Sequence, residues 1–166
     1  MDVKFVPMTC AADGKQYYVY CAKDECTRWT YREMFDEHST HSSRLFLEHF
    51  IQHAPFAIRE IQTDNGSEFT KALQSSKKDL TLFEQLLKDY DILYHRIRPA
   101  TPRHNGKVER GNRTDGLRFY SKLRMHSLED GRKQLAAYQK KSNNIIMTCL
   151  GMRSPNQILA LYQAVL

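Results

Sequence analysis

The 166-residue sequence predicts an α/β domain: a mixed five-stranded sheet, three antiparallel strands and then two parallel ones, with helices on both faces. Two observations favour this fold. Three strand-like stretches come first and are separated by short turns. Two further strands then alternate with helical stretches, an order that is typical of parallel pairing. Because no repeat or low-complexity tract interrupts this order, we treat residues 1–166 as a single domain.

The first three strands are rich in aromatic and β-branched residues, which favour a pleated sheet. Pro7 confines the first strand to a sheet edge or to a strand end, because proline cannot donate to a ladder. Asp13-Gly14 predicts a hairpin turn before the second strand. The three strands are expected at residues 3–6, 17–21 and 27–35. Connected by short turns, they predict an antiparallel meander.

The middle of the chain alternates between helices and strands. Ser39 or Thr40 is expected to cap the first helix. Thr81 and Glu84 have the spacing of a capping box at the start of the second helix, and Asp79 is a rival cap. The four elements are expected at residues 40–53 (helix), 57–63 (strand), 82–90 (helix) and 91–97 (strand).

Helices dominate the rest of the sequence. Leu117, Tyr120 and Leu123 recur at helical spacing, which predicts one helix over residues 107–123 with these three side chains buried. Gly111 and Gly116 each cost this helix about 1 kcal/mol relative to alanine. Two further helices are expected at residues 128–147 and 155–161, the last with a proline in its first turn.

Positive charge is concentrated in one segment. The chain carries a net charge of +6, and residues 93–124 contain nine Lys and Arg residues against two carboxylates, Glu109 and Asp115. The rest of the chain is therefore close to neutral. A localised basic patch indicates a polyanionic partner, most simply nucleic acid. The alternative is a solvated helix face, although such faces usually mix both signs.

Composition also excludes several classes of protein. No apolar run approaches the ~20 residues of a membrane span, and the N-terminus lacks the pattern of a signal peptide. The four cysteines form no C-x-x-C pair and have no matching histidine spacing. We interpret them as reduced thiols of a cytoplasmic protein.

Asp64 lies where an apolar strand runs into the turn signal Asn65-Gly66. One interpretation is an Asx turn, in which the Asp64 carboxylate accepts hydrogen bonds from the following backbone. The other is a functional carboxylate, held on rigid backbone but open to a metal or a substrate. Only the second interpretation requires further residues elsewhere in the chain, because a metal needs more ligands than Asp64.

Two more carboxylates are candidates for the same site. The helix at residues 40–53 is long enough to connect two parallel neighbours, so the first strand can lie beside the fourth, with Asp2 close to Asp64. Glu109 begins the helix that follows the Asn105-Gly106 turn. Mg²⁺ and Mn²⁺ prefer hard oxygen ligands, and two such ions can support phosphodiester chemistry. Without metal, the three carboxylates would repel one another.

Glu109 and His104 each have a simpler interpretation. Glu109 lies four residues before Arg113, so the two side chains can form an ordinary helical ion pair. His104 is either a phosphate contact or a plain loop histidine. The sequence alone does not choose between these alternatives.

Two motifs together resemble a known family. Asp64-Asn65-Gly66 with Glu68-Phe69, followed by Pro102-Arg103-His104-Asn105-Gly106-Lys107-Val108-Glu109-Arg110, is similar to the Asp-Asp-Glu core of bacterial insertion-sequence transposases and retroviral integrases. The opening Met1-Asp2-Val3-Lys4-Phe5-Val6-Pro7 resembles their first strand, and Leu150 to Pro155 resembles the segment that opens their final helix. Residues 23–28 resemble a turn whose aspartate, here Asp24, is structural and not catalytic.

This resemblance implies an RNase H-like fold, Mg²⁺ or Mn²⁺ as cofactor, and DNA strand cleavage and strand transfer. Asp2, Asp64 and Glu109 would be the catalytic metal ligands. Members of the group usually carry an N-terminal helix-turn-helix region that reads the ends of the element, and the expectation is that this domain lacks it. The residues expected to contact DNA are Arg103, His104, Asn105, Lys107, Arg110 and Arg113.

The expected partners are transposon ends and target duplex, with a homodimer or higher oligomer as the active assembly. The expected location is the bacterial cytoplasm, associated with the nucleoid. Two alternatives remain: an RNase H-like nuclease, and a DNA-binding transposon remnant without catalysis. The presence of all three carboxylates argues against the second, and the basic segment after Glu109 favours a long duplex over a hybrid.

Overall fold

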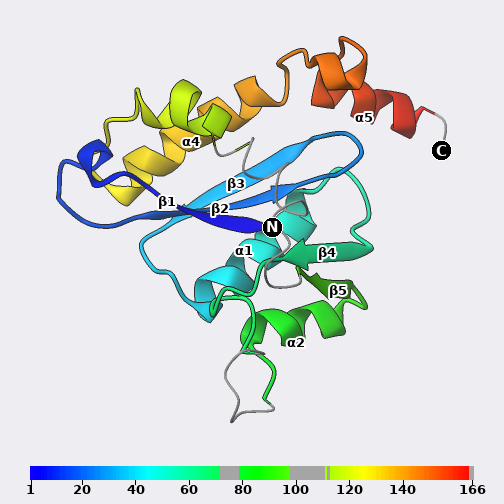
Figure 1. Cartoon of the computed structure of the whole chain (residues 1–166), viewed down its shortest axis with the longest axis horizontal. Coiled ribbons are helices and arrows are strands. Elements are labelled where there is room, and N and C mark those ends of the chain that lie inside the picture. Colours follow the sequence, from blue (N-terminus) through cyan, green and yellow to red (C-terminus); the bar gives the residue numbers. More distant parts are fainter. Residues whose placement is uncertain (72–78, 98–110, 112, 165–166) are drawn as a thin grey trace.

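A computed structural model describes residues 1–71, 79–97, 111 and 113–164. Its strands are β1 (Asp2–Phe5), β2 (Tyr18–Lys23), β3 (Thr30–Phe35), β4 (Glu60–Thr63) and β5 (Leu93–Arg96). Its helices are α1 (Thr40–His53), α2 (Leu82–Asp89), α4 (Leu128–Ser142) and α5 (Pro155–Gln163), with a π-helical turn, η3 (Gly116–Tyr120). Two 3₁₀ turns complete the set, η1 (Met8–Cys10) and η4 (Thr148–Leu150). Figure 1 shows their arrangement.

The strand pairing follows the predicted scheme in both halves. β1, β2 and β3 form an antiparallel meander, in which Asp2 lies opposite Cys21. β4 and β5 pair in parallel, with Glu60 opposite Leu93. The described residues form two hydrogen-bonded sheets, of three and two strands, where a single sheet of five was expected. The backbone nitrogen of Met1 links the two sheets by donating to the Gln62 carbonyl of β4.

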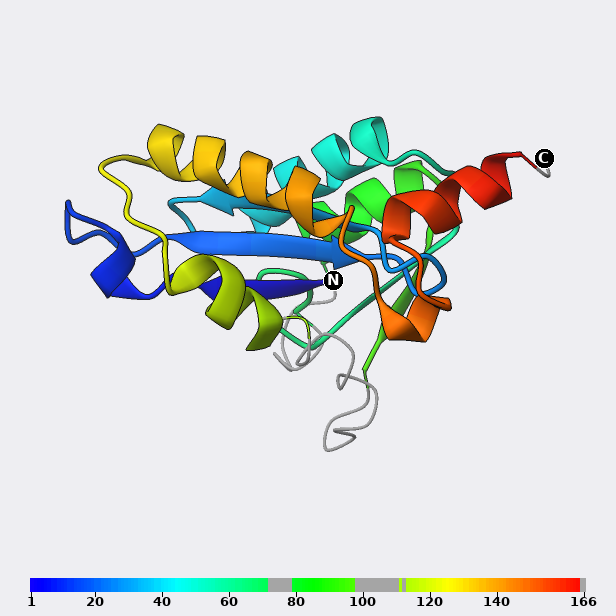
Figure 2. The ribbon, with the colours of Figure 1, turned by 90° about the horizontal axis from the view of Figure 1, so that it is seen from above.

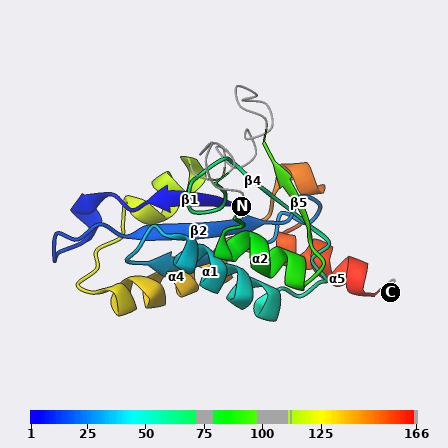
Figure 3. The ribbon, with the colours of Figure 1, turned by 90° about the horizontal axis from the view of Figure 1, so that it is seen from below.

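The three-stranded sheet has a hydrophobic core on each face, because residues of β2 alternate between the faces. Tyr20 and Ala22 point into a core shared with α1 and α2, and Val19 points into a core shared with η3 and α4. Figures 2 and 3 show η3 on the opposite side of this sheet from α1 and α2. Helices therefore pack on both faces of the three-stranded sheet.

Helix α4 covers the outer edge of β3 with side-chain hydrogen bonds. Asn143 accepts from the Thr30 nitrogen at 3.0 Å and donates to the Thr30 carbonyl at 2.9 Å. Gln139 accepts from the Arg32 nitrogen, and Arg132 donates to the Met34 carbonyl at 2.8 Å. An exposed strand edge would present these backbone groups to other chains, so α4 closes the sheet against further pairing.

The predicted helix caps are confirmed. Ser39 accepts from the Ser42 nitrogen and caps α1. Thr81 and Glu84 form the expected reciprocal capping box at α2. Ser154 forms a second capping box at the start of α5.

The helix predicted at residues 107–123 differs from expectation in its described part. The chain is helical at residue 111 and at 113–115, and then widens into η3, where Ser121 donates to the Gly116 carbonyl five residues back. The wider turn rotates the buried face, so Phe119 and Tyr120 are buried while Leu117 is 71% exposed. The expectation that Leu117 is buried was wrong.

Helix α4 ends at Ser142, whereas the sequence predicted a helix up to residue 147. Asn143 is its C-cap residue, and the Asn143 side chain is committed to the backbone of Thr30. The chain then turns and makes an isolated bridge between Met147 and Arg153. A tertiary contact therefore coincides with the end of the helix.

Candidate active site

Asp2 is brought to the place where β4 ends. Met1 precedes it and donates its nitrogen to the Gln62 carbonyl, two residues before Asp64. Burial lowers the pKa of the Met1 α-amino group, and the negative charges of Cys21, Asp2 and Asp64 act in the opposite direction. The Met1–Gln62 hydrogen bond therefore places the start of β1, with Asp2, alongside β4, which Asp64 directly follows.

Asp64 forms the Asx turn that its sequence allows. Its Oδ1 atom accepts a hydrogen bond from the Gly66 nitrogen at 3.1 Å. This bond fixes the direction of the carboxylate at the end of β4. An ionised carboxylate has about four acceptor positions, so the turn and a metal-ligand role are compatible.

The end of β4 is held rigidly against β5. Thr63 is fully buried and shares a hydrogen bond of 2.8 Å with the Tyr94 hydroxyl. Burial raises the pKa of Tyr94 to about 12, so this hydroxyl stays protonated at neutral pH. The Asn65 amide donates to the Ile97 carbonyl at 2.8 Å. These contacts on both sides of Asp64 preorganise its position.

A third carboxylate lies beneath the same turn, and sequence reasoning gave it no role. Glu68 is 6% exposed, and its Oε1 lies 3.0 Å from Nε2 of His38. A Cβ atom at Gly66 would lie 2.4 Å from Oε2 of Glu68. A side chain at this position would force the Glu68 carboxylate to move, so Gly66 has a packing role besides its turn preference.

Asp24 has the structural role that was expected for it. Its Oδ2 accepts from the Cys26 nitrogen at 3.1 Å, and from the nitrogen and hydroxyl of Thr27 at 2.6 and 2.7 Å. These bonds shape the turn between β2 and β3. Asp24 therefore stabilises that turn.

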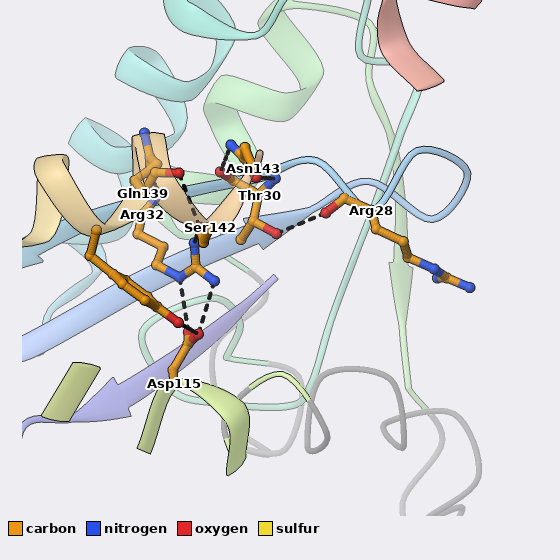
Figure 4. Close-up of polar contacts among 8 residues, drawn as sticks. Arg28, Thr30, Arg32, Asp115, Gln139, Ser142 and Asn143 are labelled. Carbon is orange, nitrogen blue, oxygen red and sulfur yellow. Dashed lines mark hydrogen bonds and ion pairs between the residues drawn. The ribbon is translucent and has the colours of Figure 1, made fainter. Parts of the chain in front are cut away.

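The other acidic residue of the basic segment, Asp115, forms a buried ion pair with Arg32 (Figure 4). Arg32 donates from Nε to Oδ2 at 2.9 Å and from Nη2 to Oδ1 at 3.1 Å. The Tyr138 hydroxyl donates to Oδ1 at 2.7 Å. The chain that follows the predicted site residue Glu109 is thereby fixed to β3 and α4. Sequence reasoning had counted Asp115 only as a charge.

Six of the predicted site residues lie outside the described residues: Glu109, Arg103, His104, Asn105, Lys107 and Arg110. Arg113 is described and exposed. Within the described ranges, no group of three or more His, Cys, Asp or Glu side chains is arranged to hold a metal ion. The donor chemistry of Asp2 and Asp64 nevertheless fits Mg²⁺ or Mn²⁺, which prefer carboxylate oxygens. All four cysteines are free thiols.

Several known proteins are similar to this chain in sequence. The family model of the integrase core domain matches residues 1–102, more than half of the chain. A protein of Spiroplasma virus SpV1-C74 named integrase ORF3 is 36% identical over 118 residues, which are 66% of this chain and 32% of that protein. A retrovirus-related Pol polyprotein from the tobacco (Nicotiana tabacum) transposon TNT 1-94 is 35% identical over 71 residues, 43% of this chain and 5% of the polyprotein.

Solved structures share the fold. The catalytic core domain of BIV integrase aligns with a TM-score of 0.66 and 18% identity, over 99% of this chain and 95% of that one. A chain in the simian T-cell lymphotropic virus intasome, solved in complex with the PP2A regulatory subunit B56 gamma, aligns with a TM-score of 0.69 and 18% identity. That alignment covers 95% of this chain and 52% of the other. The fold is thus the RNase H-like fold of integrase catalytic cores.

The chain spans about a third of the length of the viral relative and a small fraction of the polyprotein. Among the described helices, none has the length and apolar character to cross a membrane. The match over residues 1–102 includes β1, which contains Asp2, and β4, which Asp64 directly follows. The chain belongs to the integrase core domain family.

Proposed function

We propose that this chain is the catalytic domain of a DNA transposase or integrase, which cuts DNA strands and joins them to a target. The observation that carries the proposal is the Met1–Gln62 hydrogen bond, which places β1 and Asp2 alongside the strand that leads to Asp64, in a member of the integrase core domain family. Insertion sequences are the class of element that the sequence motifs favour. The names of the viral and plant relatives support an integrating element more generally.

Asp2, Asp64 and Glu109 would hold Mg²⁺ or Mn²⁺ as the ligands of a two-metal site. Bound there, the metal would polarise the phosphate and stabilise charge on the attacking and leaving oxygens. The protein's own contribution is to orient the ligands. The Gly66 nitrogen fixes one Asp64 oxygen, and the Thr63–Tyr94 bond holds the strand that carries it.

DNA would be docked by the basic segment that surrounds Glu109. Arg113 is exposed, as phosphate docking requires. Arg103, His104, Asn105, Lys107 and Arg110 are proposed as further contacts on the same segment. Assembly into a dimer or higher oligomer is proposed as well, since a structural neighbour is part of an intasome.

A strand-transfer assay tests this function directly. The full-length protein would be given pre-cut element ends and a target duplex, in Mg²⁺ and in Mn²⁺. Asp64→Asn should abolish joining, while Asp89→Asn, an equal change at an exposed position of α2, should leave it intact. If the wild type only cuts and never joins, the chain is a nuclease. If Asp64→Asn joins normally, the proposed site is wrong.

A further inference from the structure

A hollow of about 620 Å³ lies between the β2–β3 turn, η3 and the end of α4. The Arg32–Asp115 ion pair (Figure 4) lines it, together with Tyr138 and Asn143. Of the proposed DNA contacts, Arg113 also lines this hollow. Its volume is within the range of small-molecule pockets, which is roughly 300–1,000 Å³.

Four cationic side chains line the hollow besides Arg32: Lys23, Arg28, Arg113 and Arg118. Arg32 is neutralised by Asp115, which is the one carboxylate among the described lining residues. The hollow therefore has excess positive charge.

Lys23 and Arg28 are held in place by the local backbone. A Cβ atom at Gly111 would lie 3.5 Å from Nζ of Lys23, so this ammonium group rests close to the chain after Glu109. Burial lowers the pKa of Lys23, and the nearby charges of Arg32 and Arg28 lower it further, whereas Cys21 and Asp115 act in the opposite direction. An anion in the hollow would relieve this crowding of cations.

Arg28 adopts a left-handed conformation, with a φ of 63°, which a residue with a long side chain rarely does. Its nitrogen donates to the Asp24 carbonyl at 3.1 Å, and its carbonyl accepts from the Thr30 hydroxyl at 3.0 Å. Figure 4 shows the Arg28 side chain directed away from β3. The turn thus imposes a costly conformation on an arginine that lines the hollow.

The wall of the hollow beside these cations is apolar. Leu117 is 71% exposed and Ile146 is 58% exposed, and both line the hollow together with Ile145 and Met147. A surface that only docks phosphates has no use for such side chains, because phosphate contacts are polar. The ligand therefore combines negative charge with an apolar face.

We propose that this hollow binds one unpaired nucleotide of a DNA strand, with its phosphate on Arg28 and Arg118 and its base against Leu117 and Ile146. The base faces of a duplex are covered by stacking, whereas an unpaired base exposes a face that apolar side chains can cover. Cationic grooves with side chains that cover the face of a base are typical of proteins that bind single strands. This inference rests on the proposed function for the identity of the polyanion.

The position of the hollow agrees with this assignment. A smaller hollow, lined by Met1, Cys21 and Lys23, shares Lys23 and Arg32 with the larger one. Met1 adjoins Asp2 and donates to Gln62, two residues before Asp64. The nucleotide hollow therefore lies close to the proposed active site, with Lys23 and Arg32 between them.

The test measures binding of a short, fluorescently labelled single-stranded oligonucleotide and of a blunt duplex, by anisotropy in EDTA. Arg118→Glu should weaken binding of the single strand by about tenfold or more, or about 1.4 kcal/mol. Lys88→Glu is the matched control, since it makes the same charge change at an exposed position of α2, outside both the basic segment and the hollow. Leu117→Ser should weaken binding of the single strand and leave the duplex affinity unchanged.

Competition separates the nucleotide from phosphate alone. Thymidine monophosphate should displace the oligonucleotide at lower concentration than inorganic phosphate does, because only the nucleotide presents a base. Equal displacement by both would overturn the role of the apolar wall. Single-strand affinity that changes in neither Arg118→Glu nor Leu117→Ser would overturn the proposal and favour an acidic peptide as the occupant. Because EDTA removes any metal, these results are independent of whether the chain performs strand transfer.

Discussion

Arg32 and Asp115 form a bidentate ion pair that fixes the start of η3 to the central part of β3, with donor–acceptor distances of 2.9 and 3.1 Å. Both side chains are nearly buried, at 7% and 11% exposure. Tyr138 of α4 adds a hydrogen bond to the same carboxylate. Three elements that are far apart in sequence therefore meet at one charge pair. This pair also lines the proposed nucleotide hollow.

Asp115→Asn should reduce the free energy of unfolding by about 3–5 kcal/mol, because it leaves the Arg32 guanidinium buried without its counter-charge. Urea denaturation measures the loss. The double variant Arg32→Met with Asp115→Asn should lose less than the sum of the single losses, because no unpaired charge remains. Strictly additive losses would mean that the two residues do not stabilise each other.

Gly66→Ala should destabilise the fold by about 1–3 kcal/mol, as overpacking of a closely packed site does. The reason is the distance of 2.4 Å between the added Cβ atom and Oε2 of Glu68. Shortening Glu68 to alanine removes the clashing carboxylate. Thermal melts should therefore show a smaller effect of Gly66→Ala in the Glu68→Ala background. An equal effect in both backgrounds would assign the cost to backbone strain.

Stability should fall in alkaline solution between about pH 10 and pH 12. Burial raises the pKa of Tyr20 and of Tyr94 to about 12, above the value of about 10 in an unfolded chain. A raised tyrosine pKa means that the folded state holds the proton more tightly. Its stabilising contribution is complete below about pH 10 and is lost as the pH approaches 12. Tyr94→Phe starts less stable, since the Thr63 bond is lost, but should fall less steeply in this window.

Local sequence signals predicted the strands and their pairing within each of the two sheets. Short turns between the first strands gave the antiparallel meander, and the helix–strand alternation gave the parallel β4–β5 pair. The capping-box spacing of Thr81 and Glu84 located the start of α2, because such a cap is formed within four residues. The proximity of Asp2 and Asp64, expected from the long connection through α1, stays a prediction.

Contacts between distant residues explain the features that the sequence did not predict. Helix α4 ends where Asn143 binds the backbone of Thr30, and the sequence pattern of neither segment predicts this contact. The π-helical turn breaks the 3.6-residue period on which the burial of Leu117 was predicted. Glu68 was read as part of a motif, and only the fold shows that it lies under Gly66.

Mg²⁺ or Mn²⁺ should raise the melting temperature of the protein, because bound cations offset the repulsion among the proposed carboxylate ligands. The gain follows RT ln(1 + [L]/Kd), about 2.7 kcal/mol at a hundredfold excess over Kd. Asp64→Asn should abolish it, and Asp89→Asn should not. An unchanged response to metal in Asp64→Asn would remove Asp64 from the ligand set.

The last prediction separates a catalytic Glu109 from a structural one. If Glu109 only pairs with Arg113, Glu109→Gln loses an exposed helical ion pair worth about 0.3–0.5 kcal/mol, and strand transfer survives. If Glu109 is a metal ligand, glutamine keeps the shape but loses the charge that helps to hold metal. Strand transfer should then fall by orders of magnitude, while stability holds or rises because carboxylate repulsion is relieved.

DNA affinity provides the control for this variant. Removing a negative charge from a basic segment cannot weaken the attraction of phosphates, so Glu109→Gln should bind duplex DNA at least as tightly as the wild type. Loss of joining together with retained folding and retained DNA binding therefore isolates the chemical step. A Glu109→Gln protein that joins DNA ends at nearly the wild-type rate would leave Asp2 and Asp64 without their third ligand, and the two-metal proposal would fail with it.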